Sequence, residues 1–588
     1  MRRLALAAVA AALAAAALWP RTAPAAAARP PRASVPAHAR RQRKPLRWWQ
    51  HAVIYEVYPR SFKDSDGNGI GDLNGIRSKL GYLHWLGVNA IWLTPIYPSG
   101  GVDGGYDIIH YKQIAPVYGT MADFHRLVAA ARRDHIHVFM DMVLAHTSNQ
   151  NPWFAASRRS RTGPYANYYI WRDGHDGGPP NNWTSLFGGS AWQYDPLRRQ
   201  YYYHYYYRQQ PDLNWRNPAV RRAMFARARF WMRQGVAGFR LDSVGTLLVD
   251  PRFPNNPPGA MRTGDFPLPQ QHHKYNYNQP GVHRILQALR RVVAPYHGLL
   301  IGETVGKTAA QISRFYGTPR HPEIQLPFNF LFADVNRLSA PAFRRQIAAW
   351  THNPAHGTPV WFFDNHDQPR EVQRYGHGRD NASPENAKIA RLLPTLLFTL
   401  RGAVILYYGQ AIGMTTTPPK KRSDVVDPMG KRFWPVFKGR DGERTPMQWT
   451  PGPDAGFSPP GIPAKPWLPI PLSYKRFNVA TERIDPHSLL RYYRRLIALK
   501  RQDPALRRGA WISIHRRDPA VLSYLRRWRG ETVLVAINMS SRRQVENYHL
   551  GSKDAVVLAD SLRAEPARLR LGRVELPPYE AVVARLVP

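Results

Sequence analysis

Short apolar runs alternate with longer amphipathic stretches along most of the chain. The runs are three to six residues long and rich in aliphatic and aromatic residues, which is typical of buried strands. Eight of them are predicted to be strands, at 53–58, 90–93, 136–140, 236–241, 299–301, 324–328, 360–363 and 404–408. Helical stretches such as 218–234 and 339–351 lie between most of them. This alternation predicts an α/β fold of the (β/α)8 TIM-barrel type.

Two regions depart from this alternation. Residues 147–217, after the third strand, are rich in Trp, Tyr, Asn, Gly and Pro and show no helical period, so an inserted subdomain is expected there. After a helix-like stretch at 486–501, the tail from 510 contains short β-type runs such as 532–537, which predicts an antiparallel C-terminal β domain. The expected order is a barrel at 48–146 and 218–505, the insertion at 147–217 and the β domain at 506–588.

The first 47 residues have the composition of an export segment followed by a linker. Two arginines precede an apolar run from Leu4 to Trp19, and small residues follow, so residues 1–28 are predicted to be a signal peptide. Residues 29–47 are rich in Pro and Arg and are predicted to form a disordered tether. No later stretch reaches about twenty apolar residues, so no transmembrane segment is expected. The signal segment predicts a secreted or periplasmic bacterial protein, and since the chain has no cysteine, we expect it to fold without disulfides.

The chain carries a formal net charge of +42, from 82 Lys and Arg against 40 Asp and Glu. Such a field attracts nucleic acid, anionic lipid or acidic polymers without a dedicated site. Because no nucleic-acid-binding motif is present, no specific nucleic-acid partner is expected. Most of these arginines are interpreted as solvated surface positions, and electrostatic attachment to an anionic surface is the alternative. The pattern does not indicate an oligomeric state.

Three acids stand at the ends of predicted buried strands. Asp242 ends the segment GFRLD, Glu303 ends LLIGE, and Asp367 ends FFDNHD. Burying an isolated carboxylate costs several kcal/mol, so acids in such places are paired, hydrogen-bonded or functional. The carboxyl ends of barrel strands form the catalytic face, and the spacing assigns these acids to the fourth, fifth and seventh strands. The chain also has 18 Trp and 30 Tyr, whose rings offer flat faces for sugar rings. The three acids and these aromatic residues together favour an enzyme that acts on a carbohydrate.

Several short segments carry a family resemblance that runs from about Trp48 to the end of the chain. They are AVIYEVYPRSF at 52–62, DGNGIGDLNGI at 66–76, GYD at 105–107, DMVLAHTS at 141–148, QPDLNW at 210–215, GFRLD at 238–242, GE at 302–303, NHDQPR at 365–370 and RTPMQW at 444–449. In this order they resemble the α-amylase superfamily, glycoside hydrolase family 13, and within it the α-glucosidase and oligo-1,6-glucosidase group. The resemblance implies a glycosidase that acts on an oligosaccharide or disaccharide and uses no organic cofactor.

The resemblance also implies roles for the three acids. Asp242 is expected to be the nucleophile that forms a covalent glucosyl-enzyme. Glu303 is expected to protonate the leaving oxygen and then to activate water. This double displacement retains the configuration of the sugar and needs the two carboxyl groups roughly 5 Å apart. Asp367 is expected to hold sugar hydroxyls and to strain the ring.

Five further residues are implied to bind the substrate. Arg240 lies two residues before the nucleophile, on the same face of the strand, and can hold it ionised. His146 and His366 are expected to hydrogen-bond hydroxyls of the same sugar. Asp107 and Arg370 are expected to clamp its non-reducing end.

An oxygen-rich loop follows the first predicted strand. Asp64, Asp66, Asn68 and Asp72 occupy positions 1, 3, 5 and 9 of the loop, and Ile70 offers its carbonyl oxygen at position 7. This is the first part of an EF-hand-like calcium loop, but a glycine replaces the usual glutamate at position 12. Because the resembling enzymes carry a structural metal there, Ca²⁺ or Mg²⁺ is expected at these five residues. The alternative is a turn that is satisfied by its own backbone.

Ser243, directly after the nucleophile, bears on the linkage that is cleaved. In the resembling enzymes a bulky Val here accompanies α-1,6 cleavage, and a small residue accompanies α-1,4 cleavage. An exo-acting α-glucosidase that releases terminal α-1,4-linked glucose from maltose and short oligosaccharides is therefore expected. Oligo-1,6-glucosidase and a glucosyl transferase or isomerase, of the trehalose synthase or sucrose isomerase type, are alternatives. Ala145 and Ala411 depart from the family pattern, but the intact acids argue against a non-catalytic sugar-binding relative.

Overall fold

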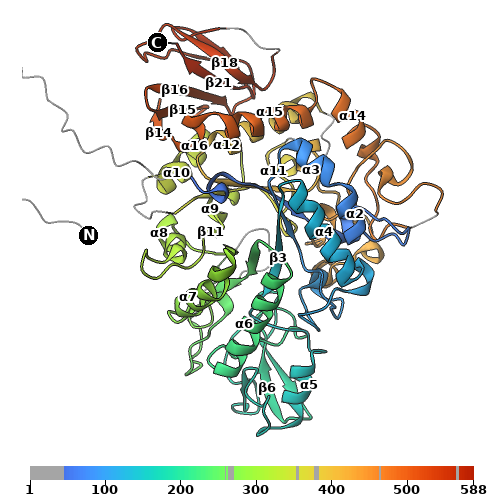
Figure 1. Ribbon diagram of the computed structural model, residues 1–588. Helices are drawn as coiled ribbons and strands as arrows, with labels where there is room; N and C mark the ends of the chain where they lie inside the picture. The colour runs from blue at the N-terminus through green and yellow to red at the C-terminus, as the bar shows by residue number, and fades with distance from the viewer. Residues whose placement is uncertain are drawn as a thin grey trace, which may run out of the picture. The chain divides into compact units, whose positions relative to one another are not determined.

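Eight strands form one sheet in the computed structural model, in the order β11-β10-β7-β3-β2-β1-β13-β12 (Figure 1). Their bounds are β1 Val53–Val57, β2 Ala90–Leu93, β3 His137–Val143, β7 Gly238–Asp242, β10 Leu299–Gly302, β11 Leu326–Pro327, β12 Val360–Trp361 and β13 Ala403–Tyr407. Neighbouring strands are parallel, and each overlaps one of the eight predicted runs. Between the end strands β11 and β12, Phe328 packs against Phe362 with ring centroids 5.1 Å apart. The predicted TIM-barrel fold is therefore confirmed.

Side chains from the strands fill the barrel. Ile54, Trp92, Phe139, Ile301 and Ile405 are all buried in one cluster. The opposite faces of the strands are buried under helices, so the strands are apolar on both sides, as parallel strands covered on both faces usually are. This is why the strands appear in the sequence as continuous apolar runs.

Amphipathic helices cover the outside of the barrel. They include α4 Met121–Arg133, α6 Pro218–Arg233, α7 Val282–Val293, α10 Ala340–Thr351 and α12 Pro384–Thr399. The start of α6 has a clear local cause, because the Asn217 side chain accepts a hydrogen bond from Ala219 N and a proline occupies the first position of the helix. The helices α6 and α7 lie side by side (Figure 1). The helix α6 coincides with the helical stretch predicted at 218–234.

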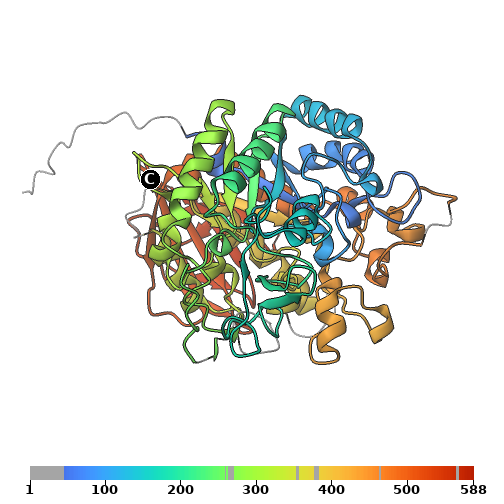
Figure 2. The same cartoon turned by 90° about the horizontal axis from the view of Figure 1, so that it is seen from below.

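The insertion after β3 contains one helix, although its sequence shows no helical period. The helix α5, Pro152–Arg159, buries Phe154, which packs against Trp171 and Tyr202. These two residues belong to a three-stranded sheet of β4 Trp171–Arg172, β6 Gln200–Tyr203 and β5 Trp192–Asp195. Figure 2, which views the molecule from below, shows this segment in front of the barrel. With only two turns, α5 is too short for its period to stand out in the sequence.

The tail forms the predicted antiparallel β domain. Its six-stranded sheet has the order β14-β15-β16-β21-β18-β19. The strands are β14 Ala510–Ile514, β15 Val521–Trp528, β16 Glu531–Asn538, β18 Asp554–Asp560, β19 Leu569–Arg570 and β21 Ala581–Leu586, and β17 Gln544–Glu546 pairs with β20 Val574–Leu576. Arg526 of β15 donates to the carbonyl oxygen of Thr399 at the end of α12, which joins this sheet to the barrel. The helix α15, Leu489–Gln502, precedes the domain.

The structure describes residues 46–258, 260–261, 270–351, 357–376, 383–462, 465–563 and 568–587. The predicted signal peptide 1–28 and the predicted tether, except for Leu46 and Arg47, lie outside these residues. From Arg47 onward the chain forms one compact unit. Among the described residues, no helix combines the length and the apolar character needed to cross a membrane.

Candidate active site

The three candidate acids lie at the carboxyl ends of barrel strands. Asp242 is the last residue of β7, Glu303 directly follows β10, and Asp367 lies on the loop after β12. Because these strands belong to one parallel sheet, the three acids are on the same face of the barrel. Their side chains are 10%, 22% and 36% exposed, respectively. They therefore face an opening and are not packed into the core.

One guanidinium group, that of Arg240, joins three carboxylates. Its Nη1 donates to Asp242 Oδ1 at 2.7 Å and to Asp141 Oδ2, on β3, at 3.0 Å. Its Nη2 donates to Glu303 Oε2 at 2.7 Å. Burial raises the pKa of Asp242, and the positive charge of Arg240 opposes that rise. Since two nitrogens of a single guanidinium reach Asp242 and Glu303, the structure holds these two acids next to each other.

Asp367 is held by two arginines on the segment that follows β13. Arg440 Nη1 and Arg444 Nη2 donate to Asp367 Oδ1 at 2.9 and 2.6 Å. Arg440 also donates to Asp103 Oδ1 at 2.6 Å and to Asp427 Oδ2 at 2.9 Å. Burial alone would raise the pKa of Asp367, but the neighbouring His366, Arg440 and Arg444 together outweigh it and hold that pKa below its ordinary value. The carboxylate is therefore ionised and fixed in orientation.

Sequence reasoning did not assign several residues of this cluster to the site, among them Asp103, Tyr106, Arg440 and Arg444. The Tyr106 hydroxyl contacts His366 Nε2 at 2.8 Å, and its ring stacks on that of His366 with centroids 5.4 Å apart. Part of the signal was visible, because Tyr106 is the centre of the GYD segment and Arg444 begins RTPMQW. A motif does not say which of its polar side chains points into the site, and only the folded loops answer that.

Asp107 and Arg370, predicted to clamp the sugar, both hydrogen-bond within the protein. Asp107 is fully buried, and its carboxylate accepts hydrogen bonds from Ser99 Oγ at 2.8 Å and from a backbone N–H at 3.0 Å. Arg370 is also fully buried, and its two Nη atoms donate to the carbonyl oxygens of Tyr408 and Glu443. These bonds hold the two side chains against neighbouring loops. Contact of Asp107 or Arg370 with a sugar stays a prediction.

The two predicted histidines both join the cluster. His366 Nδ1 contacts Glu56 Oε1, on β1, at 2.7 Å. His146 Nε2 contacts Gln210 Nε2 at 3.1 Å, and Gln210 in turn donates to Asp103 Oδ2 at 3.2 Å. Burial lowers the pKa of His146 to about 4 and that of His366 to about 3, so both imidazoles are neutral at pH 7. Contact of either ring with a sugar stays a prediction.

Ser243 borders the cluster on the side of Glu303. Its backbone N–H donates to Glu303 Oε2 at 2.9 Å, and its hydroxyl accepts a hydrogen bond from Tyr206 OH of the inserted segment. Its φ of 39° lies in the left-handed region, which β-branched residues rarely adopt. The residue after the candidate nucleophile therefore orients Glu303 through its backbone and contacts the insertion through its side chain.

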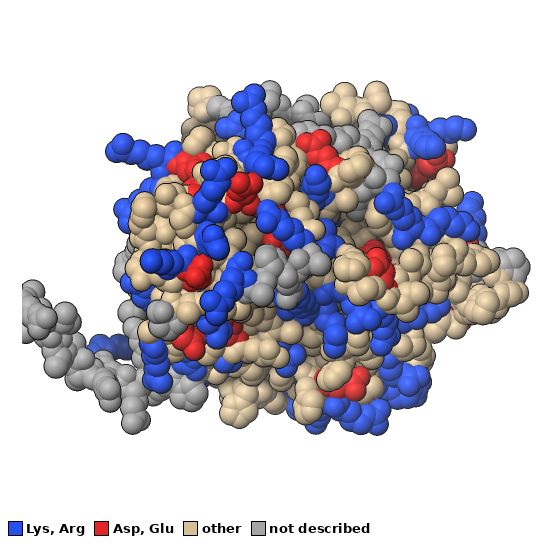
Figure 3. All heavy atoms as spheres, turned by 90° about the horizontal axis from the view of Figure 1, so that it is seen from above, with Lys and Arg blue, Asp and Glu red and all other residues tan. Residues whose placement is uncertain are grey.

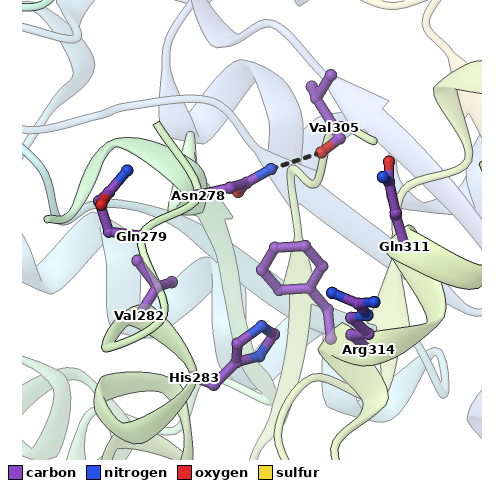
Figure 4. Close-up of a pocket in the computed structure, with 8 residues that line it drawn as sticks. Asn278, Gln279, Val282, His283, Val305, Gln311 and Arg314 are labelled. Carbon is purple, nitrogen blue, oxygen red and sulfur yellow. Dashed lines mark hydrogen bonds between the residues drawn. The ribbon is translucent and has the colours of Figure 1, made fainter. Parts of the chain in front are cut away.

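A pocket of about 250 Å³ lies beside the loop that carries Glu303 (Figure 4). Val305, two residues beyond Glu303, lines it together with His283 of α7 and Phe315. Asn278 Nδ2 donates to Val305 O at 3.0 Å at its edge. The pocket combines an aromatic side chain with amide and imidazole groups.

The predicted metal loop brings carboxylate oxygens together. One oxygen each from Asp64, Asp66 and Asp72 lies within 4.8 Å of the others. Asn68 and Ile70 belong to the same loop, where Asn68 Oδ1 accepts a hydrogen bond from Ile70 N at 2.8 Å. The Asp64 carboxylate also accepts hydrogen bonds from backbone N–H groups of the loop. Hard cations prefer oxygen donors of this kind, so the set fits Ca²⁺ or Mg²⁺.

Known proteins resemble the chain over most of its length. Residues 56–509 match the family model of the α-amylase catalytic domain. The chain is 39% identical over 503 residues to a probable alpha-glucosidase of Rhizobium meliloti (strain 1021), covering 84% of this chain and 89% of the relative. It is 35% identical over 575 residues to an oligo-1,6-glucosidase of Parageobacillus thermoglucosidasius, covering 92% and 99%. A crystal structure of a trehalulose synthase variant in complex with Tris is 36% identical and matches with a TM-score of 0.84, over 92% of this chain and 100% of that one. The chain therefore belongs to the α-amylase family of glycoside hydrolases.

Proposed function

We propose that this glycoside hydrolase is a retaining, exo-acting α-glucosidase that releases terminal α-1,4-linked glucose from maltose and short oligosaccharides. The observation that carries the proposal is the sharing of Arg240 by Asp242 and Glu303, each at 2.7 Å. Retaining enzymes hold their two carboxyl groups about 5–5.5 Å apart, whereas inverting enzymes leave about 6.5–9.5 Å for a water molecule. Two acids on the two terminal nitrogens of one guanidinium favour the shorter spacing.

The proposed reaction has two steps. In the first, an oxygen of Asp242 bonds to the anomeric carbon while the bond from that carbon to the glycosidic oxygen breaks, and Glu303 gives its proton to the departing oxygen. In the second, Glu303 takes a proton from water, and the water oxygen bonds to the anomeric carbon and displaces Asp242. Arg240 stabilises the Asp242 carboxylate before the first step and after the second, because it stays within hydrogen-bond reach.

Exo action is supported by the ion pairs at one end of the cluster. Arg440 spans from Asp103, after β2, to Asp367, after β12, and also holds Asp427. A glucose unit against this group would find fixed carboxylates and guanidinium groups for its hydroxyls. A chain that continued past that unit would run into the ion pairs. Only a terminal glucose would therefore fit.

The leaving group belongs on the side of Glu303, because that acid protonates its oxygen. Ser243 and Tyr206 border this side, and the pocket beside Val305 gives room for the rest of a short oligosaccharide (Figure 4). The small side chain of Ser243 is the basis for proposing α-1,4 over α-1,6 cleavage, since a bulky residue there would restrict how the leaving group lies.

A second candidate function is glucosyl transfer to a sugar acceptor, including isomerisation of a disaccharide. It is favoured by the structural similarity to a trehalulose synthase at a TM-score of 0.84. Likewise, the relative named oligo-1,6-glucosidase favours α-1,6 cleavage as a variant of the hydrolase. All three activities would use the same acids and differ only in which acceptor or linkage the leaving-group side admits.

Two experiments test the proposal. Asp242→Ala and Glu303→Gln should each lower the hydrolysis of maltose by several orders of magnitude while the circular dichroism spectrum stays that of the wild type, because each removes a reacting group and little packing. Near-wild-type rates in either variant would overturn the assignment. Incubation with maltose, isomaltose, trehalose and sucrose, followed by product identification, separates the three activities. Release of glucose from maltose with retained anomeric configuration is the result expected.

We also propose that the 64–72 loop holds a structural Ca²⁺ or Mg²⁺ and that the protein is exported after removal of residues 1–28. The three convergent carboxylates of the loop support the first, and the basic and apolar start of the sequence supports the second. Metal analysis of the purified protein tests the first. N-terminal sequencing of the mature chain tests the second.

A further inference from the structure

Three arginine side chains converge on one tryptophan beside the barrel. The guanidinium carbons of Arg494, Arg483 and Arg491 lie 4.8, 4.9 and 5.5 Å from the ring centroid of Trp85. Trp85 belongs to α3, Leu80–Leu86, and is half-buried against the core. Arg483 comes from α14, Val479–Ile484, and the other two come from α15, which lies beside α3 (Figure 1). We call these four residues the Trp85 cluster.

The arginines of the Trp85 cluster are not held in ion pairs with any described residue. In the described part of the chain, no carboxylate forms an ion pair with any of its three arginines. Arg494 Nε donates to Trp85 O at 2.9 Å, and Arg491 Nε donates to Arg483 O at 2.8 Å. These two bonds fix the guanidinium groups but use only their Nε atoms. The Nη amino groups of all three arginines therefore remain available to a ligand.

Three cations this close repel one another appreciably. Since all lie within 5.5 Å of one centroid, no two guanidinium carbons are farther apart than about 11 Å, which is close to the screening length of about 10 Å in 0.1 M salt. Cation–π attraction to the indole ring offsets part of this repulsion. An anion that bound between the guanidinium groups would remove the rest. The cluster is therefore arranged to gain from binding an anion.

The Trp85 cluster lies away from the catalytic face. Three residues separate the end of α3 from Ala90, where β2 begins, so Trp85 is near the amino ends of the barrel strands. His84 Nδ1 contacts the carbonyl oxygen of Asp134, which places the end of α3 beside the end of α4 on that same side. The candidate acids such as Asp242 stand at the carboxyl ends. A ligand on the cluster would leave the candidate active site open.

We propose that the Trp85 cluster is an anion-binding site through which the enzyme attaches to a phosphate-bearing polymer. Guanidinium groups match phosphate oxygens in paired hydrogen bonds, and the free Nη atoms supply the donors. One phosphate on one cluster binds weakly, but a polymer presents many phosphates to a chain of net charge +42. Figure 3, seen from the side of the C-terminal sheet, shows Lys and Arg spread over that face with few Asp and Glu. A bilayer is disfavoured as the partner because guanidinium groups cover the indole.

The test compares two triple variants that remove the same charge. The first is Arg483→Gln, Arg491→Gln and Arg494→Gln in one chain. The second replaces three exposed arginines on separate segments, at Arg222, Arg320 and Arg517, by Gln. Binding of each full-length protein to long-chain inorganic polyphosphate is measured by fluorescence anisotropy in about 0.15 M salt.

The cluster variant should bind polyphosphate at least about tenfold more weakly than the wild type, and the scattered variant less than about threefold more weakly. Maltose hydrolysis should be unchanged in both variants, and in the wild type with polyphosphate bound. Equal weakening in the two variants would show a diffuse charge effect and overturn the site. Cluster-dependent binding to vesicles with about 30% phosphatidylglycerol, without binding to polyphosphate, would make a membrane the partner and overturn the polymer. If the first variant misfolds, Arg→Lys at the same three positions keeps the charge and should still lose several-fold in affinity, because the paired hydrogen bonds are lost.

Discussion

Arg440 and Arg370 offer the sharpest contrast between what a motif suggests and what the fold does. Both are buried arginines near the candidate site, but Arg440 donates to Asp103, Asp367 and Asp427, whereas Arg370 donates to backbone carbonyl oxygens. We predict that Arg440→Met impairs catalysis in the folded enzyme. Arg370→Met should impair stability and leave the activity of the molecules that fold nearly intact.

The expected losses of activity and stability follow from the groups that lose a hydrogen-bonding partner in each variant. Arg440→Met removes the same hydrogen-bonding partner from each of three acids. Breaking a buried ion pair by removing one member destabilises a protein by about 3–5 kcal/mol. Asp367 keeps its bond to Arg444 at 2.6 Å, so we expect about 2–4 kcal/mol to appear as lost transition-state stabilisation. That corresponds to a decrease of about 30- to 1000-fold in kcat/KM. Arg370→Met removes the side-chain donor of the buried Tyr408 carbonyl oxygen, at about 1–3 kcal/mol in unfolding free energy, whereas the Glu443 carbonyl oxygen keeps Tyr407 OH as a donor at 3.1 Å.

The assay is maltose hydrolysis by the folded fraction of each variant, together with unfolding in urea. Arg370→Met should show a lowered unfolding midpoint and a kcat/KM within about threefold of the wild type. Lys420→Met, at an exposed lysine of the same segment, is the control and should change neither. A larger loss of kcat/KM in Arg370→Met than in Arg440→Met would refute the reasoning and support the clamp expected from sequence.

Three other predictions concern linkage, pH and metal. Ser243→Val should raise the ratio of kcat/KM for isomaltose to kcat/KM for maltose by an amount equivalent to about 1–3 kcal/mol. Ser243→Ala should leave the ratio unchanged, because the volume of this side chain limits how the leaving group lies. An unchanged ratio in the Val variant would count against a role of Ser243 in linkage preference. Burial lowers the pKa of Lys500 to about 7, so between pH 7 and about 10.4 the unfolded chain binds more protons and wild-type stability should rise with pH. Lys500→Met should lack that rise in thermal unfolding scans, while Lys553→Met, at an exposed lysine, should keep it; the same slope in both variants would contradict the assignment. A chelator should lower the melting temperature of the wild type but not that of Asp72→Ala, and equal shifts would argue against a metal in the 64–72 loop.

Most of the strands and helices of the barrel could be predicted from local sequence patterns. A barrel strand buried on both faces must be apolar at nearly every position, and β2 and β13 are visible for that reason alone. The start of α6 is also local, since Asn217 and the following proline suffice to begin a helix. The sequence does not predict the helix α5, because two turns give too few repeats to show a helical period. Packing against β4 and β6 stabilises this helix.

The sequence by itself determined the strand order along the chain and the placing of Asp242 and Glu303 at strand ends, because both properties depend on neighbouring residues. Which polar side chains complete the site was decided only by the tertiary structure. Arg440 is 73 residues from Asp367 and 337 residues from Asp103, and closure of the barrel brings the three together. Asp103 and Asp107 are four residues apart on one loop, yet only Asp103 joins the cluster. A loop has no regular period, so its side-chain directions follow from contacts with distant segments and not from spacing.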